Sequence, residues 1–362
     1  MIECGTQCLI CDYPIHLDTY IGCAHACRYC FAREKQSIAT VRPLDNAKAL
    51  RAFTEGHRTN ETRWCDWRIP VHWGSSSDPF QRAELIHGRS LEALEIFAET
   101  GYPFIVSTKN PVLAAQEPYL GLLAKSRCVF QISMAAPEYD RLEPGAPTYE
   151  ERLEAAAILS EVCTRVIARV QPYFTDQYKA VLREIPRYAR AGIYGIIVEG
   201  YATRKKQKGL VKDGKYGFPV SVLAPQFKQI RERAHQNGLR FFCGEDMLRF
   251  LGDDLSCCGT EGLEDFRPNR YNLEHLAHEP EAPEPTEAMQ QKENTRPFRS
   301  LCQTNAWAKE VRHKTFAQLM TEIGEPWIRR YKDLRAQYGD DEQRRRAAAA
   351  ATTSGEPERR KS

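Results

Sequence analysis

The stretch HLDTYIGCAHACRYCFAR, residues 16–33, decides how the rest of the chain is interpreted. HLDTYIG (16–22) is a β-rich run, and the residues after it place Cys23, Cys27 and Cys30 in the spacing C-x3-C-x2-C. Three thiolates on a loop after a strand can bind three corners of a four-iron cluster, which leaves the fourth iron open for a small molecule. A closed structural zinc site requires a fourth protein ligand, and this loop offers only His25 nearby.

The composition of the 362 residues sets the class of protein. Apolar residues make up 42%, enough for a buried core, and the formal net charge of +3 gives no signal for nucleic-acid binding. The N-terminus lacks the charged and apolar regions of a signal peptide, and no run of about 18 apolar residues is present. We therefore expect a cytoplasmic protein without a membrane segment. In that compartment, most of the 13 cysteines are better explained as metal ligands or buried thiols than as disulfides.

β-rich runs alternate with amphipathic helical patterns along most of the chain. The expected strands are 16–22, 69–75, 103–109, 128–134, 165–171, 194–200 and 239–245. The clearest helical patterns are 91–100, 149–162 with Thr148 as N-cap, and 224–238, which ends in Gly238. Strand and helix in turn predict βαβ units and a parallel sheet. The predicted fold class is α/β, a partial or complete (β/α) barrel of the TIM type with catalytic groups at the carboxyl ends of its strands.

The predicted organisation has five regions. They are a cysteine-rich N-terminal segment with a second metal site (1–15), the barrel (16–248), a Cys-containing loop and polar linker (249–300), a mainly helical C-terminal extension (301–338) and a disordered tail (339–362). The linker prediction rests on the Pro/Glu-rich run 274–294.

The spacing of the second cysteine group, with the aromatic Tyr29 before the last cysteine, resembles the signature of the radical SAM superfamily. Other stretches are similar to its spore photoproduct lyase-like branch, whose members are often labelled DNA repair photolyases. These stretches are SSSDPFQRAE (75–84), STKNPVL (107–113), ISM (132–134), LEPGAPTYEERLEA (142–155) and ARVQPYF (168–174). The resemblance implies a barrel of the radical SAM type. It also implies that S-adenosylmethionine (SAM) binds the open iron and is cleaved reductively to a 5′-deoxyadenosyl radical.

The resemblance also implies roles for individual residues by motif position. Lys109 would pair with the SAM carboxylate, and Ser133 and Arg169 would bind the ribose or the carboxylate. Tyr29 would face the adenine, and the amino group would be contacted by Ser75, Ser76 and Ser77. The alternative for each residue is an ordinary polar side chain at a strand end.

One position departs from the branch. In spore photoproduct lyases the stretch after the second strand begins with a cysteine that returns a hydrogen atom to the product, whereas this chain has Ser75 there. A serine O–H is a far poorer hydrogen-atom donor, so repair of spore photoproduct itself is disfavoured. The sequence assigns no catalytic residue in its place.

The first cysteine group, CGTQCLIC (4–11), has the same spacing in a different setting. Only three residues precede Cys4, so no strand is expected to lead into it, and Ile10 replaces the aromatic residue. Cys4, Cys8 and Cys11 are therefore predicted to bind a second metal, either an auxiliary [4Fe-4S] cluster or zinc. The candidates for the fourth ligand are Cys243, Cys257 and Cys258.

The substrate is the least constrained prediction. The branch and the basic stretch ATRKKQKGLVKDGK (202–215) favour a nucleic acid or a modified nucleobase, with Glu199 facing SAM or substrate at the end of its strand. A peptide or small metabolite is the alternative substrate, and a zinc-stabilised binding protein without catalysis is the alternative class. A radical SAM enzyme requires an electron donor such as flavodoxin or ferredoxin.

Overall fold

The computed structural model describes residues 2–4, 11–34, 40–59, 62, 65, 67–269, 271–278, 318 and 320–340. Eight strands form one sheet. In spatial order they are β1 (Ile2–Cys4), β2 (Ile15–Leu17), β5 (Val71–Trp73), β6 (Phe104–Thr108), β7 (Cys128–Ser133), β8 (Arg165–Tyr173), β9 (Gly195–Gly200) and β13 (Arg240–Cys243). From β2 to β13 all neighbours are parallel. The seven predicted strands and the α/β class are therefore confirmed.

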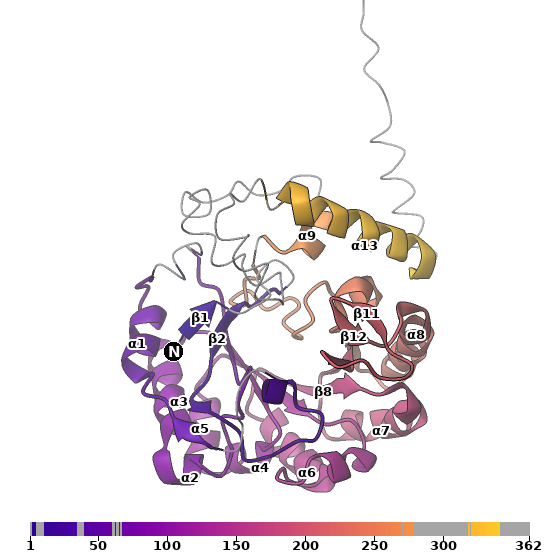
Figure 1. Ribbon diagram of the computed structural model, residues 1–362. Coiled ribbons are helices and arrows are strands. Elements are labelled where there is room, and N and C mark those ends of the chain that lie inside the picture. Colours follow the sequence, from indigo (N-terminus) through magenta and orange to yellow (C-terminus); the bar gives the residue numbers. More distant parts are fainter. Residues whose placement is uncertain are drawn as a thin grey trace, which may run out of the picture.

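Helices cover the outer side of this sheet in an arc (Figure 1). They are α1 (Ala47–Thr54), α2 (Glu84–His87), α3 (Arg89–Thr100), α4 (Pro111–Ala114), α5 (Tyr119–Leu123), α6 (Tyr149–Ser160), α7 (Tyr178–Arg190) and α8 (Val220–Gln236). Thr148 caps α6 in a capping box with Glu151, as its position before the helix predicts. Helix α8 begins four residues before the predicted start, at Val220 after Pro219, and Gly238 follows its end with φ +74°. None of the described helices combines the length and the apolar character needed to cross a membrane.

The sheet is an incomplete barrel, because β13 at one edge pairs only with β9 and β1 occupies the other edge. Strand β1 corrects the expectation that no strand precedes the first cysteine group. It pairs antiparallel with the whole of β2, and Cys4 lies opposite Ile15 at the amino end of β2. The predicted strand 16–22 is also interrupted, because the chain turns after Leu17 and β3 (Tyr20–Ile21) pairs with β4 (Arg42–Pro43) instead. Gly22 has φ +81° there, and a Cβ would lie 2.4 Å from the Thr40 carbonyl oxygen.

The C-terminal elements cover the open edge of the barrel (Figure 1). Helix α9 (Leu273–His278) corrects the linker prediction, since it occupies the start of the polar run. Helix α13 (Glu325–Tyr338) confirms part of the helical extension, and its Tyr331 is fully buried against Phe250, Trp327 and His278. The tail beyond 340 lies outside the described residues. In the described part of the chain, the remaining short helices are 3₁₀ segments at Phe31–Glu34, Pro137–Leu142, Thr175–Gln177 and Asp246–Leu251 and a π segment at Met320–Gly324.

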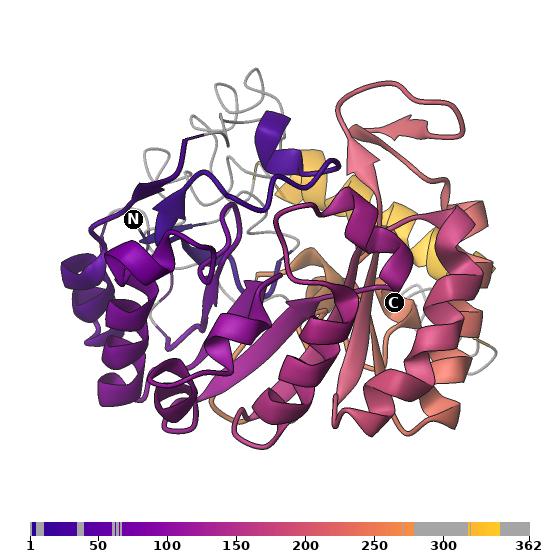
Figure 2. The same ribbon diagram turned by 90° about the horizontal axis from the view of Figure 1, so that it is seen from below.

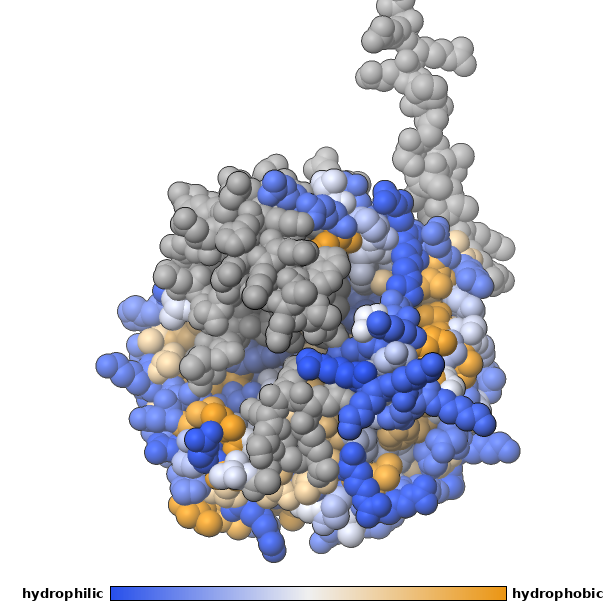
Figure 3. Space-filling view, viewed as in Figure 1, coloured by the Kyte–Doolittle hydropathy of each residue, from blue (hydrophilic) through white to orange (hydrophobic). Residues whose placement is uncertain are grey.

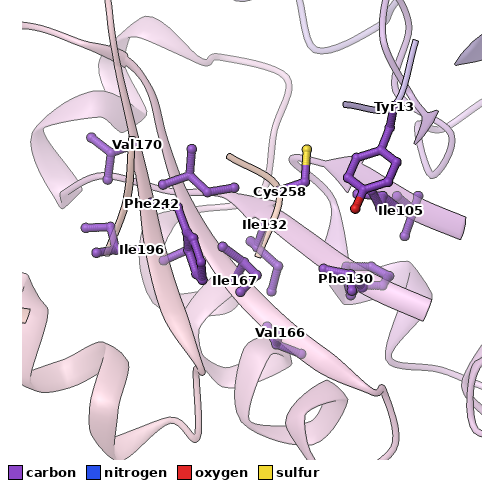
Figure 4. Close-up of a cluster of buried hydrophobic side chains, with 14 of the residues drawn as sticks. Tyr13, Ile105, Phe130, Ile132, Val166, Ile167, Val170, Ile196, Phe242 and Cys258 are labelled. Carbon is purple, nitrogen blue, oxygen red and sulfur yellow. The ribbon is translucent and has the colours of Figure 1, made fainter. Parts of the chain in front are cut away.

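The two faces of the sheet have different chemistry. On the outer face Trp73 packs against Phe97 and Phe104 under α3, and all three side chains are fully buried. On the inner face, polar side chains alternate with these core residues, as in a strand of period two. His72 there contacts His16 with ring centroids 5.8 Å apart. Figure 4 shows Cys258 and Tyr13 from two other segments within the same buried cluster as Ile132, Ile167 and Phe242.

A small antiparallel ribbon follows β9. It consists of β10 (Ala202–Thr203), β12 (Lys215–Gly217) and β11 (Val211–Asp213). Figure 2 shows the ribbon projecting on the same side of the sheet as the segment Phe31–Glu34, which is the side of the strands' carboxyl ends. The basic stretch of the sequence is therefore at the mouth of the barrel.

Candidate functional site

The loop of Cys23, Cys27 and Cys30 follows β2 at the carboxyl end of the sheet. Its backbone is held by neighbouring loops, since Ala24 N–H donates to Gln81 Oε1 over 2.8 Å and Arg28 N–H donates to the Leu142 carbonyl over 2.8 Å. All three cysteines are free thiols, and Cys27 is buried. Burial raises the pKa of Cys23 and of Cys27 to about 12, and the nearby Lys109 ammonium opposes the shift at Cys27. These thiols are therefore protonated unless a metal or another cation displaces the proton.

Asp78 connects this loop to the sheet. Its carboxylate accepts hydrogen bonds from Thr108 Oγ1 over 2.7 Å and from Lys109 N–H over 2.6 Å. It also lies 3.2 Å from His25 Nε2, while His25 Nδ1 is 2.8 Å from the Gly145 carbonyl oxygen. Both ring nitrogens face oxygen atoms, and this arrangement favours the imidazolium form, in which each nitrogen carries a proton. Burial opposes this charge, but Asp78 outweighs burial and raises the pKa of His25.

One narrow pocket beside the loop brings together four of the predicted cofactor residues. It is lined by Tyr29, Lys109, Ser133, Met134, Ala135, Tyr139, Glu143, Arg169, Gln171 and Pro172. Ser133 ends β7, Arg169 lies beside it within β8, and Tyr29 and Lys109 lie on the loops that follow β3 and β6. Their convergence agrees with the expected location of a barrel site.

Glu143 organises one wall of this pocket. It lies 3.3 Å from Lys109 Nζ and 2.6 Å from Arg152 Nη1, and it accepts a hydrogen bond from the Tyr29 hydroxyl. Burial favours the neutral acid, but Lys109 and Arg152 outweigh burial and lower the pKa of Glu143. Lys109 Nζ also lies 5.4 Å from the centroid of the Tyr29 ring. The lysine is thus held at the pocket by a charge and an aromatic face.

Arg169 forms the other wall and extends into the barrel interior. Its Nη1 donates to Ser107 Oγ over 2.9 Å and to Gln131 Oε1 over 2.7 Å. His72 Nε2 lies 3.1 Å from the same Ser107 hydroxyl. Burial and the Arg169 charge lower the pKa of His72, so this histidine is neutral. Arg169 therefore stands as a positioned cation among neutral polar groups.

Ser75, Ser76 and Ser77 are placed differently from the other predicted residues. The hydroxyls of Ser75 and Ser77 donate to Asp18 over 3.1 and 3.2 Å, and the N–H groups of Ser76 and Ser77 donate to Asp18 over 3.1 and 3.0 Å. These four donors bind the Asp18 carboxylate, which directly follows β2. The three serines are not among the residues that line the pocket.

Two acidic residues lie at the carboxyl ends of β9 and β13: Glu199 near the end of β9 and Glu245 just after β13. Burial raises the pKa of Glu199 to about 8, and Arg169 opposes the shift while Glu245 adds to it. Burial and Asp246 raise the pKa of Glu245 to about 7. The Gly200 N–H donates to Glu245 over 3.2 Å. Glu199 is therefore largely a protonated acid at neutral pH, and it can donate a hydrogen bond near Arg169.

Of the three candidates for a fourth ligand of the first cysteine group, two lie near Cys11. The Cys257 and Cys258 sulfurs are 3.7 Å apart, and Cys11 interacts electrostatically with both. Cys243 is buried in β13, and its Sγ contacts the Glu245 carbonyl oxygen at 3.8 Å. The side chains of Cys4 and Cys8 lie outside the described residues.

Some residues of the site were not predicted from the sequence. Asp78, Glu143 and Arg152 form its charged frame, and Asp18 binds the serines. Two of them, Asp78 in SSSDP and Glu143 in LEPG, stand in quoted motifs after strands, so acidic residues at strand ends were the available signal. Across the described ranges, no three His, Cys, Asp or Glu side chains converge closely enough to hold one metal ion.

No protein-family model matches the chain. The uncharacterized proteins Rv2578c of Mycobacterium tuberculosis and Mb2609c of Mycobacterium bovis are each 29% identical to it over 201 residues, which are 52% of this chain and 59% of theirs. The uncharacterized protein ORF301 of Acidianus two-tailed virus is 27% identical over 169 residues, 44% of this chain and 55% of that protein. The chain thus spans less than two thirds of the length of these relatives.

Solved structures with a similar fold include SuiB of Streptococcus suis bound to S-adenosylmethionine, with a TM-score of 0.46 and 14% identity over 65% of this chain and 51% of that chain. They also include anSMEcpe with bound AdoMet and the peptide Cp18Cys, with a TM-score of 0.47 and 9% identity over 92% of this chain and 99% of that chain. The cobalamin-dependent S-adenosylmethionine radical enzyme OxsB has a TM-score of 0.33 and 11% identity over 93% of this chain and 49% of that chain. At these values the interpretation of the site depends on this chain's own residues.

Proposed function

We propose that this chain is a radical SAM enzyme in which Cys23, Cys27 and Cys30 hold a [4Fe-4S] cluster. The observation that carries the proposal is the pocket next to these thiols, which unites Tyr29 with Lys109, Ser133 and Arg169 from separate strands. When bound, such a cluster supplies the electron that cleaves the sulfonium bond of SAM and yields a 5′-deoxyadenosyl radical.

The described residues suit a cluster better than a single ion. A mononuclear zinc ion requires its ligands to converge on one point, and no three described His, Cys, Asp or Glu side chains do so. The thiolates of an iron–sulfur cluster bind separate irons and are spaced apart by the cluster itself. The raised pKa of His25 and the Lys109 ammonium near Cys27 both favour an anionic metal–thiolate group on the loop.

Lys109 and Arg169 are the groups that we assign to the SAM carboxylate. Both are cations in one pocket, and a cation in a partly buried pocket stabilises a bound carboxylate through a charge-assisted hydrogen bond. Glu143 holds the Lys109 ammonium in position. A bound SAM carboxylate would share this ammonium with Glu143. The Tyr29 ring, 6.0 Å from the Phe174 ring, offers an aromatic surface for the adenine.

We assign a nucleic acid or a modified nucleobase as the substrate class. Lys205, Lys206, Lys208 and Lys212 are exposed on and before the ribbon at the barrel mouth, and Figure 3 shows hydrophilic side chains over this part of the surface. A row of aromatic rings leads from the pocket to the ribbon, because Phe174 contacts both Tyr29 and Tyr201, the latter with centroids 5.0 Å apart. Lysines suit phosphates, and aromatic rings suit unpaired bases.

Anaerobic reconstitution with iron and sulfide tests the enzymatic proposal. With a chemical reductant or reduced flavodoxin as electron donor, we expect the brown protein to convert SAM into 5′-deoxyadenosine. Replacement of Cys23, Cys27 and Cys30 by alanine should abolish this product, and Cys163→Ala, a buried thiol on the outer side, should preserve it. A colourless protein that binds zinc and leaves SAM intact contradicts the proposal.

A separate experiment tests the substrate class. Binding of a fluorescent single-stranded oligonucleotide should weaken as salt is raised, and the slope of log affinity against log salt should fall when Lys205, Lys206 and Lys208 become glutamine. The matched control is Lys125→Gln, an exposed lysine beyond α5 on another part of the molecule. Equal salt slopes for the wild type and the triple variant contradict this assignment.

A further inference from the structure

Two adjacent cysteines, Cys257 and Cys258, are not among the residues that line the proposed SAM pocket. Their sulfur atoms are 3.7 Å apart, and both are free thiols. Cys258 is buried, whereas Cys257 is partly exposed. Across the described ranges, no third His, Cys, Asp or Glu group joins them closely enough to hold a metal ion. The pair therefore offers the chemistry of two neighbouring thiols.

The loop that carries the pair is packed against the inner face of the sheet. Gly259 has φ +74°, and a Cβ there would lie 2.6 Å from Ile167 Cδ1 of β8, so the backbone of the loop lies directly on this strand. Arg165 Nη1 donates to the Gly259 carbonyl over 3.0 Å. The Cys258 N–H donates to Ser256 Oγ over 3.3 Å. These contacts hold the backbone on both sides of the two thiols.

A disulfide between adjacent residues has unusual geometry. Neighbouring Cα atoms are about 3.8 Å apart across a trans peptide, whereas the Cα atoms of ordinary disulfides are about 4.4–6.8 Å apart. A disulfide that departs from the ordinary geometry is more easily reduced, and such disulfides are typically the labile and regulatory ones. The sulfurs of Cys257 and Cys258 already stand 3.7 Å apart, so they need only a small approach to bond.

We propose that Cys257 and Cys258 form a redox-modification site, at which a small-molecule disulfide closes a vicinal disulfide and a small-molecule thiol reopens it. This inference goes beyond the proposed function. It does not depend on a cluster in the loop of Cys23, Cys27 and Cys30, because the reaction uses the two adjacent thiols alone.

The reaction at this site is thiol–disulfide exchange. The partly exposed Cys257, as a thiolate, attacks one sulfur of the oxidant, which breaks the oxidant's S–S bond, releases one small thiol and leaves a mixed disulfide. The buried Cys258 then attacks the Cys257 sulfur and releases the second small thiol. The two cysteines lose two electrons and two protons, and both are recovered in the two small thiols.

Gln131 connects the pair with the SAM pocket. Its amide nitrogen donates to the Cys258 carbonyl over 3.1 Å, and its amide oxygen accepts from Arg169 Nη1 over 2.7 Å. Closure of the ring changes the backbone at Cys258, so we expect the hydrogen bond from Gln131 to weaken in the disulfide form. Because coupling between two sites is reciprocal, a change at Gln131 should also shift the balance between dithiol and disulfide.

Peptide mass analysis of the full chain tests the site. The protein is equilibrated anaerobically with mixtures of oxidised and reduced glutathione, and free thiols are then blocked with N-ethylmaleimide in denaturant. The tryptic peptide 250–270 contains Cys257 and Cys258 and no other cysteine. In oxidised glutathione we expect this peptide to be unblocked and about two mass units lighter than the dithiol, and excess reduced glutathione should restore the dithiol.

Two controls accompany this measurement. The peptide 241–249 carries only Cys243, a buried single thiol, which should be blocked at every glutathione ratio. Cys258→Ser should stop at a glutathione adduct of Cys257, because the second attack then lacks its thiol.

The outcomes separate this inference from the proposed function. Blocking of both thiols at every glutathione ratio overturns the site. A stable glutathione adduct of the wild type, or a cross-link from peptide 250–270 to the peptide that contains Cys11, also overturns it, because neither is a ring between adjacent sulfurs. The measurement detects the peptide and not SAM cleavage, so failure of either proposal leaves the other standing.

A second measurement tests the connection to the pocket. Gln131→Met keeps the size of the side chain and removes the donor to the Cys258 carbonyl. At a fixed glutathione ratio, we expect the ratio of disulfide to dithiol to rise about threefold to tenfold, the effect of one hydrogen bond that no longer favours the open form. Gln116→Met, at an exposed glutamine, is the matched control and should leave the ratio unchanged. Equal ratios in Gln131→Met and the wild type overturn the connection.

Discussion

The two groups of cysteines offer the same thiol groups but lie at different places in the barrel. Cys23, Cys27 and Cys30 lie on a loop at the carboxyl end of the sheet, beside a pocket with Lys109 and Arg169. The group of Cys11, Cys257 and Cys258 lies inside the barrel, between the N-terminal segment and the loop after Asp253, with buried charged residues around it. Similar thiols thus stand once beside a pocket lined by cations at the carboxyl end of the sheet and once among buried charged residues of the barrel interior. We infer that the position in the barrel, rather than the cysteine spacing, assigns the two groups their roles.

The largest expected effect comes from removing a ligand from one group at a time. Cys27→Ala should reduce 5′-deoxyadenosine formation to background, because the loop then lacks a ligand for the cluster that faces SAM. Cys11→Ser should leave a measurable rate of SAM cleavage, since the loop of Cys23, Cys27 and Cys30 keeps its three thiols. Chromatography of anaerobic reactions with dithionite measures both. Equal loss in the two variants contradicts the division of roles.

The second effect concerns Asp78, which holds the loop of Cys23, Cys27 and Cys30 through His25. Asp78→Asn removes the buried charge that faces His25, and breaking a buried ion pair costs about 3–5 kcal/mol. We expect the free energy of unfolding to fall by about 3 kcal/mol, together with a loss of iron from the loop of Cys23, Cys27 and Cys30. Denaturant unfolding and iron analysis measure the two changes. Glu92→Gln, which breaks an exposed pair with Arg89, is the control and should cost less than about 1 kcal/mol.

The third effect concerns Lys109, the cation near Cys27 in the pocket beside the loop. Lys109→Met keeps the apolar stem and removes the charge that we assign to the SAM carboxylate. A hydrogen bond to a charged group contributes about 1.5–3 kcal/mol, so SAM affinity should fall roughly 10- to 100-fold. Equilibrium dialysis under anaerobic conditions measures this affinity. Unchanged affinity would remove Lys109 from the site, and Lys125→Met serves as the control for a lost surface charge.

The smallest effect concerns Glu199 in β9, a partly buried acid with an altered pKa. Burial raises its pKa to about 8, so the folded state holds a proton that the unfolded state has lost above about pH 4.5. The stability contribution of Glu199 therefore declines as pH rises through this range and reaches its minimum above about pH 8.

Glu199→Gln cannot ionise and removes this decline. We expect wild type to lose about 2–3 kcal/mol relative to Glu199→Gln between pH 6 and pH 8.5. Thermal unfolding at the two pH values measures the difference. A gap that stays constant with pH would show that Glu199 ionises normally.

The fold was largely predictable because buried parallel strands are continuous apolar runs, and all seven runs became strands. The exceptions have local causes. Strand β1 has only three residues, Ile2–Cys4, and therefore no detectable periodicity. The run 16–22 ends as a sheet strand at Leu17, because Asp18 binds the Ser76 and Ser77 amides and turns the chain. Whether the barrel closes depends on the packing of α9 and α13, which no strand pattern encodes.

The site was predictable where residues follow parallel strands. Lys109, Ser133 and Arg169 meet because the carboxyl ends of neighbouring parallel strands share one edge. The partners of those residues were not predictable, because ion pairs depend on how loops approach one another in three dimensions. Glu143 meets Arg152 and Lys109 in this way. Ser75–Ser77 followed the same positional rule, yet their donors bind Asp18, an acid 57 to 59 positions earlier in the chain.

The central claim is that the loop of Cys23, Cys27 and Cys30 leaves one iron open to SAM. Electron–nuclear double resonance of the reduced protein with isotope-labelled SAM measures this contact directly. The account predicts hyperfine coupling between the labelled amino or carboxylate group and a cluster in the wild type and in the Cys257→Ser/Cys258→Ser variant. Absence of coupling in a protein that contains iron, or coupling that survives in the Cys23/Cys27/Cys30→Ala variant, would contradict it.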